Sequence, residues 1–317
     1  MREGRSWIHP LCFALVLLTA IEMVGSVPGQ PAVAGARSRS LKVGSLTRSY
    51  LLHMPSSLPD SRPAALVLVF HGGGGSPSGV DRLTRWSALA DREGFLVAYP
   101  EGVGFHWNDG RTTVASGAGP QADDVGFVAA MLDDIARERP LDPRRVYATG
   151  VSNGAIFAHY VGARLSARIA AIAAVAGGMA DPFHVTFRPE RPVSVLIIHG
   201  TKDPQIPYGG GDIQGGVLGR ILPTEEALRL WAERNGATRP PSVEELPPSN
   251  DERCGGRRLF VNGRSATEVV LVRLEGGGHT WPGGPVRYLP ERQFGRLCRD
   301  FDATAVIWDF FKDHPKP

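Results

Sequence analysis

A serine between two glycines marks residues 150–155, GVSNGA. Ser152 lies two positions from Gly150 and two from Gly154, directly after the apolar run 146–149. The spacing G-x-S-x-G is typical of a sharp strand-to-helix turn that exposes a nucleophilic serine and tolerates only small neighbours. Glycine and serine are also common in ordinary turns, so the pentapeptide alone leaves a plain turn as the alternative. The rest of the sequence has to supply the other groups that a serine nucleophile needs.

A glycine-rich segment, HGGGGS at 71–76, follows the apolar run 65–70. Consecutive glycines let backbone N–H groups approach a substrate oxygen and stabilise a developing oxyanion. We expect the two donors to be the N–H of Gly73 and the N–H of Asn153, the residue after the serine. The alternative is a flexible loop. A phosphate-binding loop is excluded, because the G-x-x-x-x-G-K-[ST] spacing is missing.

A general base must follow both the serine and an acid if the chain order is Ser, Asp or Glu, then His. Of the nine histidines, His279 and His314 meet this condition. His279 lies in the glycine-rich segment GGGHTWPGG after the apolar run 268–274, whereas His314 lies three residues from the C-terminus, where chains fray. The sequence therefore predicts His279 as the base.

An acid to orient the base is expected between Ser152 and His279. The aspartates in this interval are Asp181, Asp203, Asp212 and Asp251. Asp203 directly follows the strong apolar run 192–200, so its carboxylate can be held rigidly; an aspartate in an ordinary turn is the alternative. We expect Asp203 to orient the imidazole of His279 and to stabilise its protonated form. His199, at the end of the same run, is interpreted as a packed histidine.

Two tryptophans lie beside these loops. Trp281 is two residues after His279, and Trp107 lies in the segment GFHWNDGR after the apolar run 95–99. Both are predicted to contact substrate, with simple packing in the core as the alternative for each. A flat indole face in the cleft would favour an aromatic or sugar ring.

Apolar runs alternate with helix-like segments from about residue 65 onward. The runs are 65–70, 95–99, 144–150, 169–177, 192–200 and 268–276, and the predicted helices are 81–94, 123–140, 153–165, 224–236 and 302–313. Asp123 and Asp124 are expected to cap the second of these helices. Near-continuous apolar strands interleaved with helices predict an α/β fold with a mostly parallel central sheet and helices on both faces. Ligands bind at the carboxyl ends of the strands in such sheets, which is where the candidate residues lie.

The first 36 residues have the outline of a secretory signal peptide: two early arginines, an apolar stretch of about 11 residues and small residues ending at Ala36. That stretch is shorter than the roughly 20 residues of a membrane span, although an uncleaved anchor is the alternative. We therefore expect a secreted protein with a catalytic domain at 37–317 and no stable membrane association. With 35 basic and 32 acidic residues, dispersed along the chain, no nucleic-acid partner is expected.

Two of the three cysteines, Cys254 and Cys298, lie beyond the signal segment. In an oxidising compartment such a pair predicts a disulfide. Two thiols without a cysteine and histidine cluster make a poor zinc site, and no metal or other cofactor is predicted.

The mature sequence resembles the secreted α/β-hydrolase esterases grouped with polyhydroxybutyrate depolymerases and feruloyl or acetylxylan esterases. The resemblance lies in HGGGGS, YPEGVGFHWNDGR, DDVGFV, YATGVSNGA, HGTKDPQIPYGG and GGGHTWPGG, in that order. It implies the α/β-hydrolase fold and a serine esterase with Ser152, Asp203 and His279 as its triad. No linker or polymer-binding domain follows the closing helix, which counts against action on solid polyester. A serine peptidase or a non-catalytic binding protein of the same fold remains the alternative.

Overall fold

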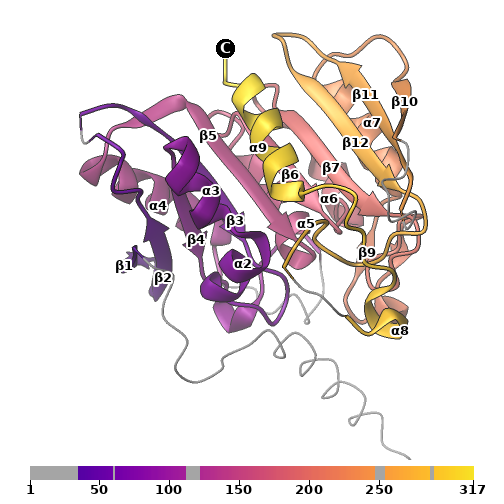
Figure 1. Ribbon diagram of the computed structural model, residues 1–317, viewed down its shortest axis with the longest axis horizontal. Helices are drawn as coiled ribbons and strands as arrows, with labels where there is room; N and C mark the ends of the chain where they lie inside the picture. The colour runs from indigo at the N-terminus through magenta and orange to yellow at the C-terminus, as the bar shows by residue number, and fades with distance from the viewer. Residues whose placement is uncertain (1–34, 60, 112–121, 247–253, 286–288) are drawn as a thin grey trace, which may run out of the picture.

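A ten-stranded sheet forms the centre of the molecule, in the order β1-β2-β4-β3-β5-β6-β7-β12-β11-β10 (Figure 1). The computed structural model describes residues 35–317 except 60, 112–121, 247–253 and 286–288, so the expected signal segment lies almost wholly outside the described residues. The strands are β1 (Ala36–Val43), β2 (Leu46–His53), β3 (Ala64–Phe70), β4 (Leu96–Pro100), β5 (Leu141–Val151), β6 (Ala171–Val175), β7 (Ser194–Gly200), β10 (Ser242–Leu246), β11 (Gly256–Asn262) and β12 (Glu268–Leu274), with a separate pair β8 (Gly211–Asp212) and β9 (Arg220–Ile221).

The six central strands, from β4 to β12 in that order, are parallel, which confirms the predicted α/β class. The register aligns their carboxyl ends. Gly150 of β5 lies opposite Phe70 of β3, and Gly200 of β7 lies opposite Leu274 of β12. The loops that follow these four strands therefore leave the sheet along one edge, and these are the loops that carry the candidate residues.

Helices cover both faces of the sheet (Figure 1). The helices are α2 (Pro77–Thr84), α3 (Trp86–Glu93), α4 (Asp124–Glu138), α5 (Asn153–Arg164), α6 (Asp181–Thr186), α7 (Thr224–Arg234), α8 (Glu291–Phe294) and α9 (Ala303–Asp313), with short 3-10 turns at Val103–Phe105 and Gln214–Gly216. Alternate residues of each strand face opposite sides, so the sheet carries two apolar cores. One core packs Leu66 and Leu68 of β3 with residues of α4, α5 and α7; the other packs Val67 and Val69 with residues of α3 and α9.

Four antiparallel strands at the two sheet edges, β1, β2, β10 and β11, were not expected from the sequence. Their residues are largely polar and many are exposed: β1 reads ARSRSLKV and β10 reads SVEEL. Edge strands of this kind have no long apolar run to reveal them. Across β10 and β11 the register pairs Glu244 with Arg258 and Glu245 with Arg257.

The predicted helix 81–94 is wrong in one respect, because two helices meet there at Arg85. This residue has φ 60°, and its N–H donates to the carbonyl of Asp81, which ends α2. The carboxylate of Asp81 then accepts the N–H of Ser87 at 3.1 Å, in the first turn of α3. The buried side chain of Asp81 therefore supports a break that the helical pattern conceals.

Asp123 caps α4 as expected, its carboxylate accepting the N–H of Gly126 at 2.7 Å. Asp124 has a different role from the one predicted. Its buried carboxylate accepts from Arg48 at 2.6 Å and from the N–H of Asn108 at 2.7 Å. Across the described part of the chain, every helix is too short or too polar to span a bilayer.

Candidate active site

Ser152 occupies the turn between β5 and α5 with φ 57° and ψ −123°. A positive φ is unusual for a residue with a Cβ and signals a conformation that the surroundings impose. The surroundings explain both glycines of the motif. A Cβ at Gly154 would lie 2.3 Å from the carbonyl oxygen of Phe70, and one at Gly150 would lie 2.5 Å from the carbonyl of Gly154. The predicted strand-to-helix turn is thus present, with its glycines required by close packing.

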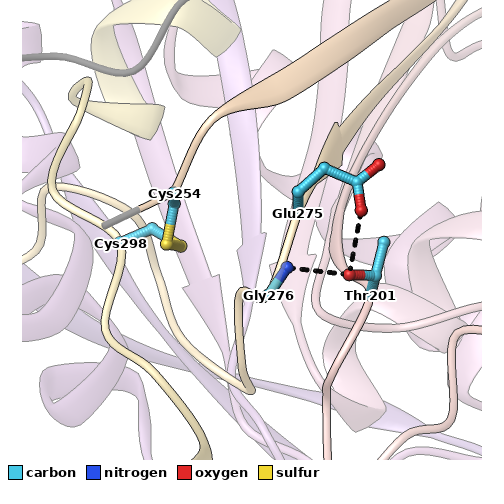
Figure 2. Close-up of a disulfide and its surroundings, with 5 residues drawn as sticks. All are labelled: Thr201, Cys254, Glu275, Gly276 and Cys298. Carbon is cyan, nitrogen blue, oxygen red and sulfur yellow. Dashed lines mark hydrogen bonds between the residues drawn. A yellow bond between two sulfur atoms is a disulfide. The ribbon is translucent and has the colours of Figure 1, made fainter. Parts of the chain in front are cut away.

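Backbone and side-chain contacts join the loops after β7 and β12. The hydroxyl of Thr201 accepts the N–H of Gly276 at 2.8 Å and donates to Glu275 at 3.4 Å (Figure 2). The N–H of Lys202 donates to the carbonyl of Gly277 at 2.9 Å. A Cβ at Gly200 would lie 2.2 Å from that same carbonyl oxygen, so the loops pack without room for a side chain.

Asp203 and His279 meet where these loops converge, with Nδ1 of His279 2.8 Å from Oδ2 of Asp203. Both side chains are buried. A carboxylate accepts, so Nδ1 carries the hydrogen and Nε2 is left as the acceptor of the neutral ring. Among the described residues, no hydrogen bond joins Oγ of Ser152 to His279; such bonds are often long before substrate binds.

The carboxylate of Asp203 has a full set of donors. Oδ1 accepts the N–H groups of Gln205 and Ile206 at 2.8 and 2.9 Å. His199 is packed as expected, and its Nε2 also lies 3.3 Å from Oδ2 of Asp203. Burial raises the pKa of Asp203, but the two histidines outweigh this effect and hold the pKa well below its usual range. Asp203 is therefore a carboxylate, suited to stabilise a protonated His279.

The glycine-rich loop lies across the serine turn. A Cβ at Gly72 would be 3.4 Å from Cβ of Ser152, and one at Gly73 would be 3.8 Å from Cβ of Asn153. Asn153 is the first residue of α5, and the first N–H groups of a helix have no partner within the helix. The two residues predicted to supply oxyanion donors thus lie side by side beside the serine.

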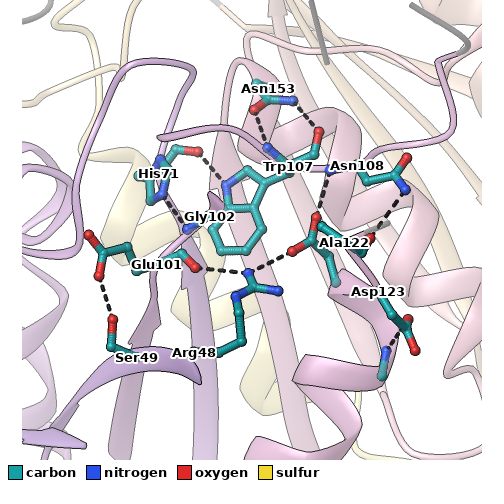
Figure 3. Close-up of polar contacts among 12 residues, drawn as sticks. Arg48, Ser49, His71, Glu101, Gly102, Trp107, Asn108, Ala122, Asp123 and Asn153 are labelled. Carbon is teal, nitrogen blue, oxygen red and sulfur yellow. Dashed lines mark hydrogen bonds and ion pairs between the residues drawn. The ribbon is translucent and has the colours of Figure 1, made fainter. Parts of the chain in front are cut away.

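His71 anchors this loop to the one after β4. Its Nδ1 donates to the carbonyl of Gly72 at 2.7 Å. Its Nε2 accepts the N–H of Gly102 at 3.0 Å (Figure 3). The acceptor role of Nε2 requires a neutral ring, because both nitrogens of a protonated ring are donors. Burial lowers the pKa of His71 from 6.5 to about 4, with the nearby His106 adding to the effect and the bond to Gly72 opposing it.

The low pKa of His71 predicts a loss of stability in acid. Below about pH 6.5 the unfolded chain protonates this ring while the folded protein does not, so the free energy of unfolding falls until the pH approaches 4. Between about pH 7.5 and 4.5 we expect His71 to account for a loss of about 2.5 kcal/mol. Denaturant unfolding at both pH values should show His71→Gln losing correspondingly less stability than the wild type. Equal losses in the two proteins would contradict this assignment.

Trp107 does not face a ligand, which corrects the sequence expectation. Its side chain is 0% exposed and stacks on Phe157 with ring centroids 5.0 Å apart. Its indole N–H donates to the carbonyl of His71 at 2.9 Å, and its backbone N–H donates to Oδ1 of Asn153 at 2.9 Å (Figure 3). Trp107 is therefore a core residue that connects the glycine-rich loop to the serine turn.

Trp281 is also buried, at 2% exposed, and its indole N–H donates to Thr304 at 3.0 Å. The hydroxyl of Thr304 in turn donates a hydrogen bond to the carbonyl of Thr84 at 2.5 Å. The ring thus joins the His279 loop to α2 and α9, and the predicted contact with substrate is corrected to packing.

Two residues that the sequence analysis did not single out are Phe105 and His106. Phe105 is 53% exposed with φ 63°, and its carbonyl accepts the N–H of Gly74 at 2.9 Å. A Cβ at Gly73 would lie 3.0 Å from the ring of His106. The tip of the loop after β4 therefore lies against the glycine-rich loop and exposes an aromatic ring. The two glycines of the segment GVGFHW indicate a turn, but they do not indicate which of its aromatic side chains is exposed.

The alternative acids and base lie elsewhere. Asp181 and Asp212 both contact Arg220, at 3.3 and 2.6 Å. Asp251 lies outside the described residues. His314 lies 3.7 Å from Glu268, at the opposite end of β12 from His279.

The predicted disulfide between Cys254 and Cys298 is present, with Cα atoms 5.6 Å apart (Figure 2). It lies next to the loop that carries His279. A Cβ at Gly277 would be 2.9 Å from Sγ of Cys298, and the carbonyl of Cys298 accepts the N–H of Gly283 at 3.2 Å. The disulfide thus packs against both ends of the loop that carries His279. Where the structure describes the chain, no cluster of three or more His, Cys, Asp or Glu could hold a metal.

Solved structures share this fold at low sequence identity. Acetyl xylan esterase from Aspergillus awamori superimposes with a TM-score of 0.54 at 15% identity, covering 79% of this chain and 96% of that one. The native structure of sOPH gives a TM-score of 0.53 at 18% identity, covering 92% and 90%. These likenesses, together with the parallel sheet and the serine turn, define an α/β-hydrolase fold.

Sequence relatives assign the class. A protein of Nocardia uniformis subsp. tsuyamanensis, named putative esterase NocK, is 34% identical over 307 residues, covering 92% of this chain and 87% of that protein. Feruloyl esterase B of Piromyces equi is 28% identical over 256 residues, and this chain spans 45% of its length. The protein is an esterase, a hydrolase of carboxylic esters. The sequence profile named Esterase PHB depolymerase matches residues 48–188, and the chain belongs to that family.

Proposed function

We propose that the protein is a serine esterase in which Ser152 is the nucleophile, His279 the general base and Asp203 the residue that orients the base. The observation that carries the proposal is the 2.8 Å contact between Asp203 and His279, on loops that leave the sheet along the same edge as a serine held at φ 57°. With Nδ1 bonded to the carboxylate, Nε2 of His279 is free to take a proton.

The reaction has two halves. Oγ of Ser152 bonds to the ester carbonyl carbon while its proton passes to Nε2 of His279, and the carbonyl electrons move onto oxygen. The oxyanion accepts from the N–H groups of Gly73 and Asn153. Collapse breaks the bond to the alcohol oxygen, which leaves with the proton from His279. Water then attacks the acyl-enzyme, giving its proton to His279, and the acid departs as Ser152 is restored.

We propose aromatic acyl esters, of the feruloyl kind, as preferred substrates over acetyl esters. Relatives named feruloyl esterase support this chemistry, as do relatives named acetylxylan esterase and poly(3-hydroxyalkanoate) depolymerase for esters in general. The exposed ring of Phe105 beside the glycine-rich loop favours the aromatic class, because ring pairs add about 0.5 to 1.5 kcal/mol beyond area burial.

A panel of methyl ferulate, an acetyl ester and a 3-hydroxybutyrate ester tests both proposals. We expect hydrolysis by the wild type with the highest kcat/KM on methyl ferulate. Phe105→Ala should lower kcat/KM several-fold more for the ferulate than for the acetyl ester. Val243→Ala, which removes an apolar side chain 58% exposed on the edge strand β10, is the matched control and should change neither value. Equal losses on both esters in Phe105→Ala would exclude Phe105 as a substrate contact.

We also propose that residues 1–36 are a signal peptide removed on export, leaving a catalytic domain at 37–317. Strand β1 begins at Ala36, which pairs with His53 at the end of β2. The proposed cleavage site therefore lies at the start of the folded domain. N-terminal sequencing of exported protein tests this boundary.

A further inference from the structure

A buried ion pair lies beside the serine turn and has no part in the chemistry proposed above. Asp109 is 0% exposed and Arg111 is 7% exposed. Nε of Arg111 lies 3.0 Å from each carboxylate oxygen of Asp109, and Nη2 lies 2.7 Å from Oδ2. Nη1 donates to the carbonyl of Leu218 at 2.7 Å, in the turn between β8 and β9.

The pair reaches the serine turn through one side chain. Nδ2 of Asn153 donates to Oδ2 of Asp109 at 2.6 Å and to the carbonyl of Trp107 at 3.3 Å. Oδ1 of Asn153 accepts the N–H of Trp107 at 2.9 Å. Both polar atoms of the Asn153 amide are therefore engaged, and the side chain has one orientation available.

Stability alone does not account for charges in this position. Taking two charged groups out of water costs free energy that their attraction barely offsets, and well-packed apolar residues often serve equally well. A buried pair can instead impose one arrangement on its neighbours. Here the neighbour is Asn153, whose backbone N–H is one of the two proposed oxyanion donors.

We propose that Asp109 is a positioning residue for the oxyanion hole. Its carboxylate, neutralised and held by Arg111, fixes the side chain of Asn153 so that the N–H of the same residue points at the developing oxyanion. This inference rests on the proposed serine esterase function. Asp109 itself touches neither the substrate nor the reacting atoms.

A double-mutant cycle between Asp109→Asn and Asn153→Ala tests the proposal. Each single variant keeps the backbone N–H of residue 153 but weakens or removes its side-chain anchor. We expect kcat to fall roughly 10- to 100-fold in each, with KM little changed, since misplaced catalytic groups cost this order of magnitude. The double variant should be no slower than Asn153→Ala, because Asp109 acts through the amide that this variant lacks.

A reversible trifluoromethyl ketone gives a second measurement that a purely structural role would not change. Its adduct with a serine carries an oxyanion, so its inhibition constant should rise by a factor similar to the loss in kcat. Asp124→Asn is the matched control: it removes another buried carboxylate paired with an arginine, at 2.6 Å, that does not contact Asn153. It should lower Tm and leave kcat and the ketone affinity near wild type.

Several results would overturn the proposal. Asp109→Asn with a lower Tm but unchanged kcat and ketone affinity would make the pair structural, as would losses that multiply in the double variant. If Asp109→Asn does not fold, Asn153→Ala decides alone, because it leaves the ion pair intact: normal turnover and ketone affinity would overturn the inference. A wild type that neither hydrolyses esters nor binds the ketone would instead refute the proposed function itself.

Discussion

Replacing Ser152 by Ala is expected to lower kcat by roughly 10⁶-fold while the protein remains folded. The alanine keeps the Cβ of the serine, so the positive φ of this turn is no more strained than before. Only Oγ is lost, and with it the atom that would form the acyl-enzyme. Without Oγ no acyl-enzyme forms, and only the much slower direct attack of water on the ester remains.

The measurement is steady-state hydrolysis of methyl ferulate, with circular dichroism to verify the fold. Ser194→Ala is the matched control, since Ser194 is another buried serine whose hydroxyl accepts the N–H of Glu268 at 3.2 Å, at the opposite end of β7 from Asp203. A fluorophosphonate should label the wild type on Ser152 and leave Ser152→Ala unlabelled. Comparable activity in the two alanine variants would rule out Ser152 as the nucleophile.

Replacing Asp203 by Asn is expected to lower kcat by about 10⁴-fold, through the tautomer of His279. Two backbone N–H groups, from Gln205 and Ile206, point at Oδ1, so the amide oxygen of an asparagine must take that place. The NH₂ group then lies at the position of Oδ2, opposite Nδ1 of His279. An NH₂ group donates, so Nδ1 becomes the acceptor and the ring hydrogen moves to Nε2, the atom that has to accept the proton of Ser152.

Kinetics of Asp203→Asn on the same substrate, at constant pH, check this expectation. Asp212→Asn is the control, because Asp212 contacts Arg220 at 2.6 Å and does not contact His279. Activity of Asp203→Asn within tenfold of the wild type would show that another group orients the base.

The parallel core and the loops at its carboxyl edge could be predicted from the sequence because buried parallel strands are continuous apolar runs. The chain order of serine, aspartate and histidine in the loops after these runs then identified Asp203 and His279, which the structure brings into contact. The edge strands could not be predicted, because strands such as β1 consist mainly of polar residues and are half exposed.

Which side chains of a loop are buried and which are exposed could not be predicted from the sequence either. Trp107 and Phe105 lie two residues apart in one loop, yet the first is buried and the second exposed. The difference depends on left-handed φ values at Gly104 and Phe105, and composition does not encode them. Asp109 and Arg111 likewise look like ordinary loop residues until their contacts with Asn153 are seen.

The disulfide between Cys254 and Cys298 links the edge of the sheet to the segment under the His279 loop. Most residues of the two apolar cores on either face of the sheet lie outside the segment around Cys298. We therefore expect reduction to disturb the loop of the proposed base, His279, before it unfolds the sheet, so that activity is lost while the protein remains folded. We expect oxidation of the two thiols to be a step in assembling the proposed site.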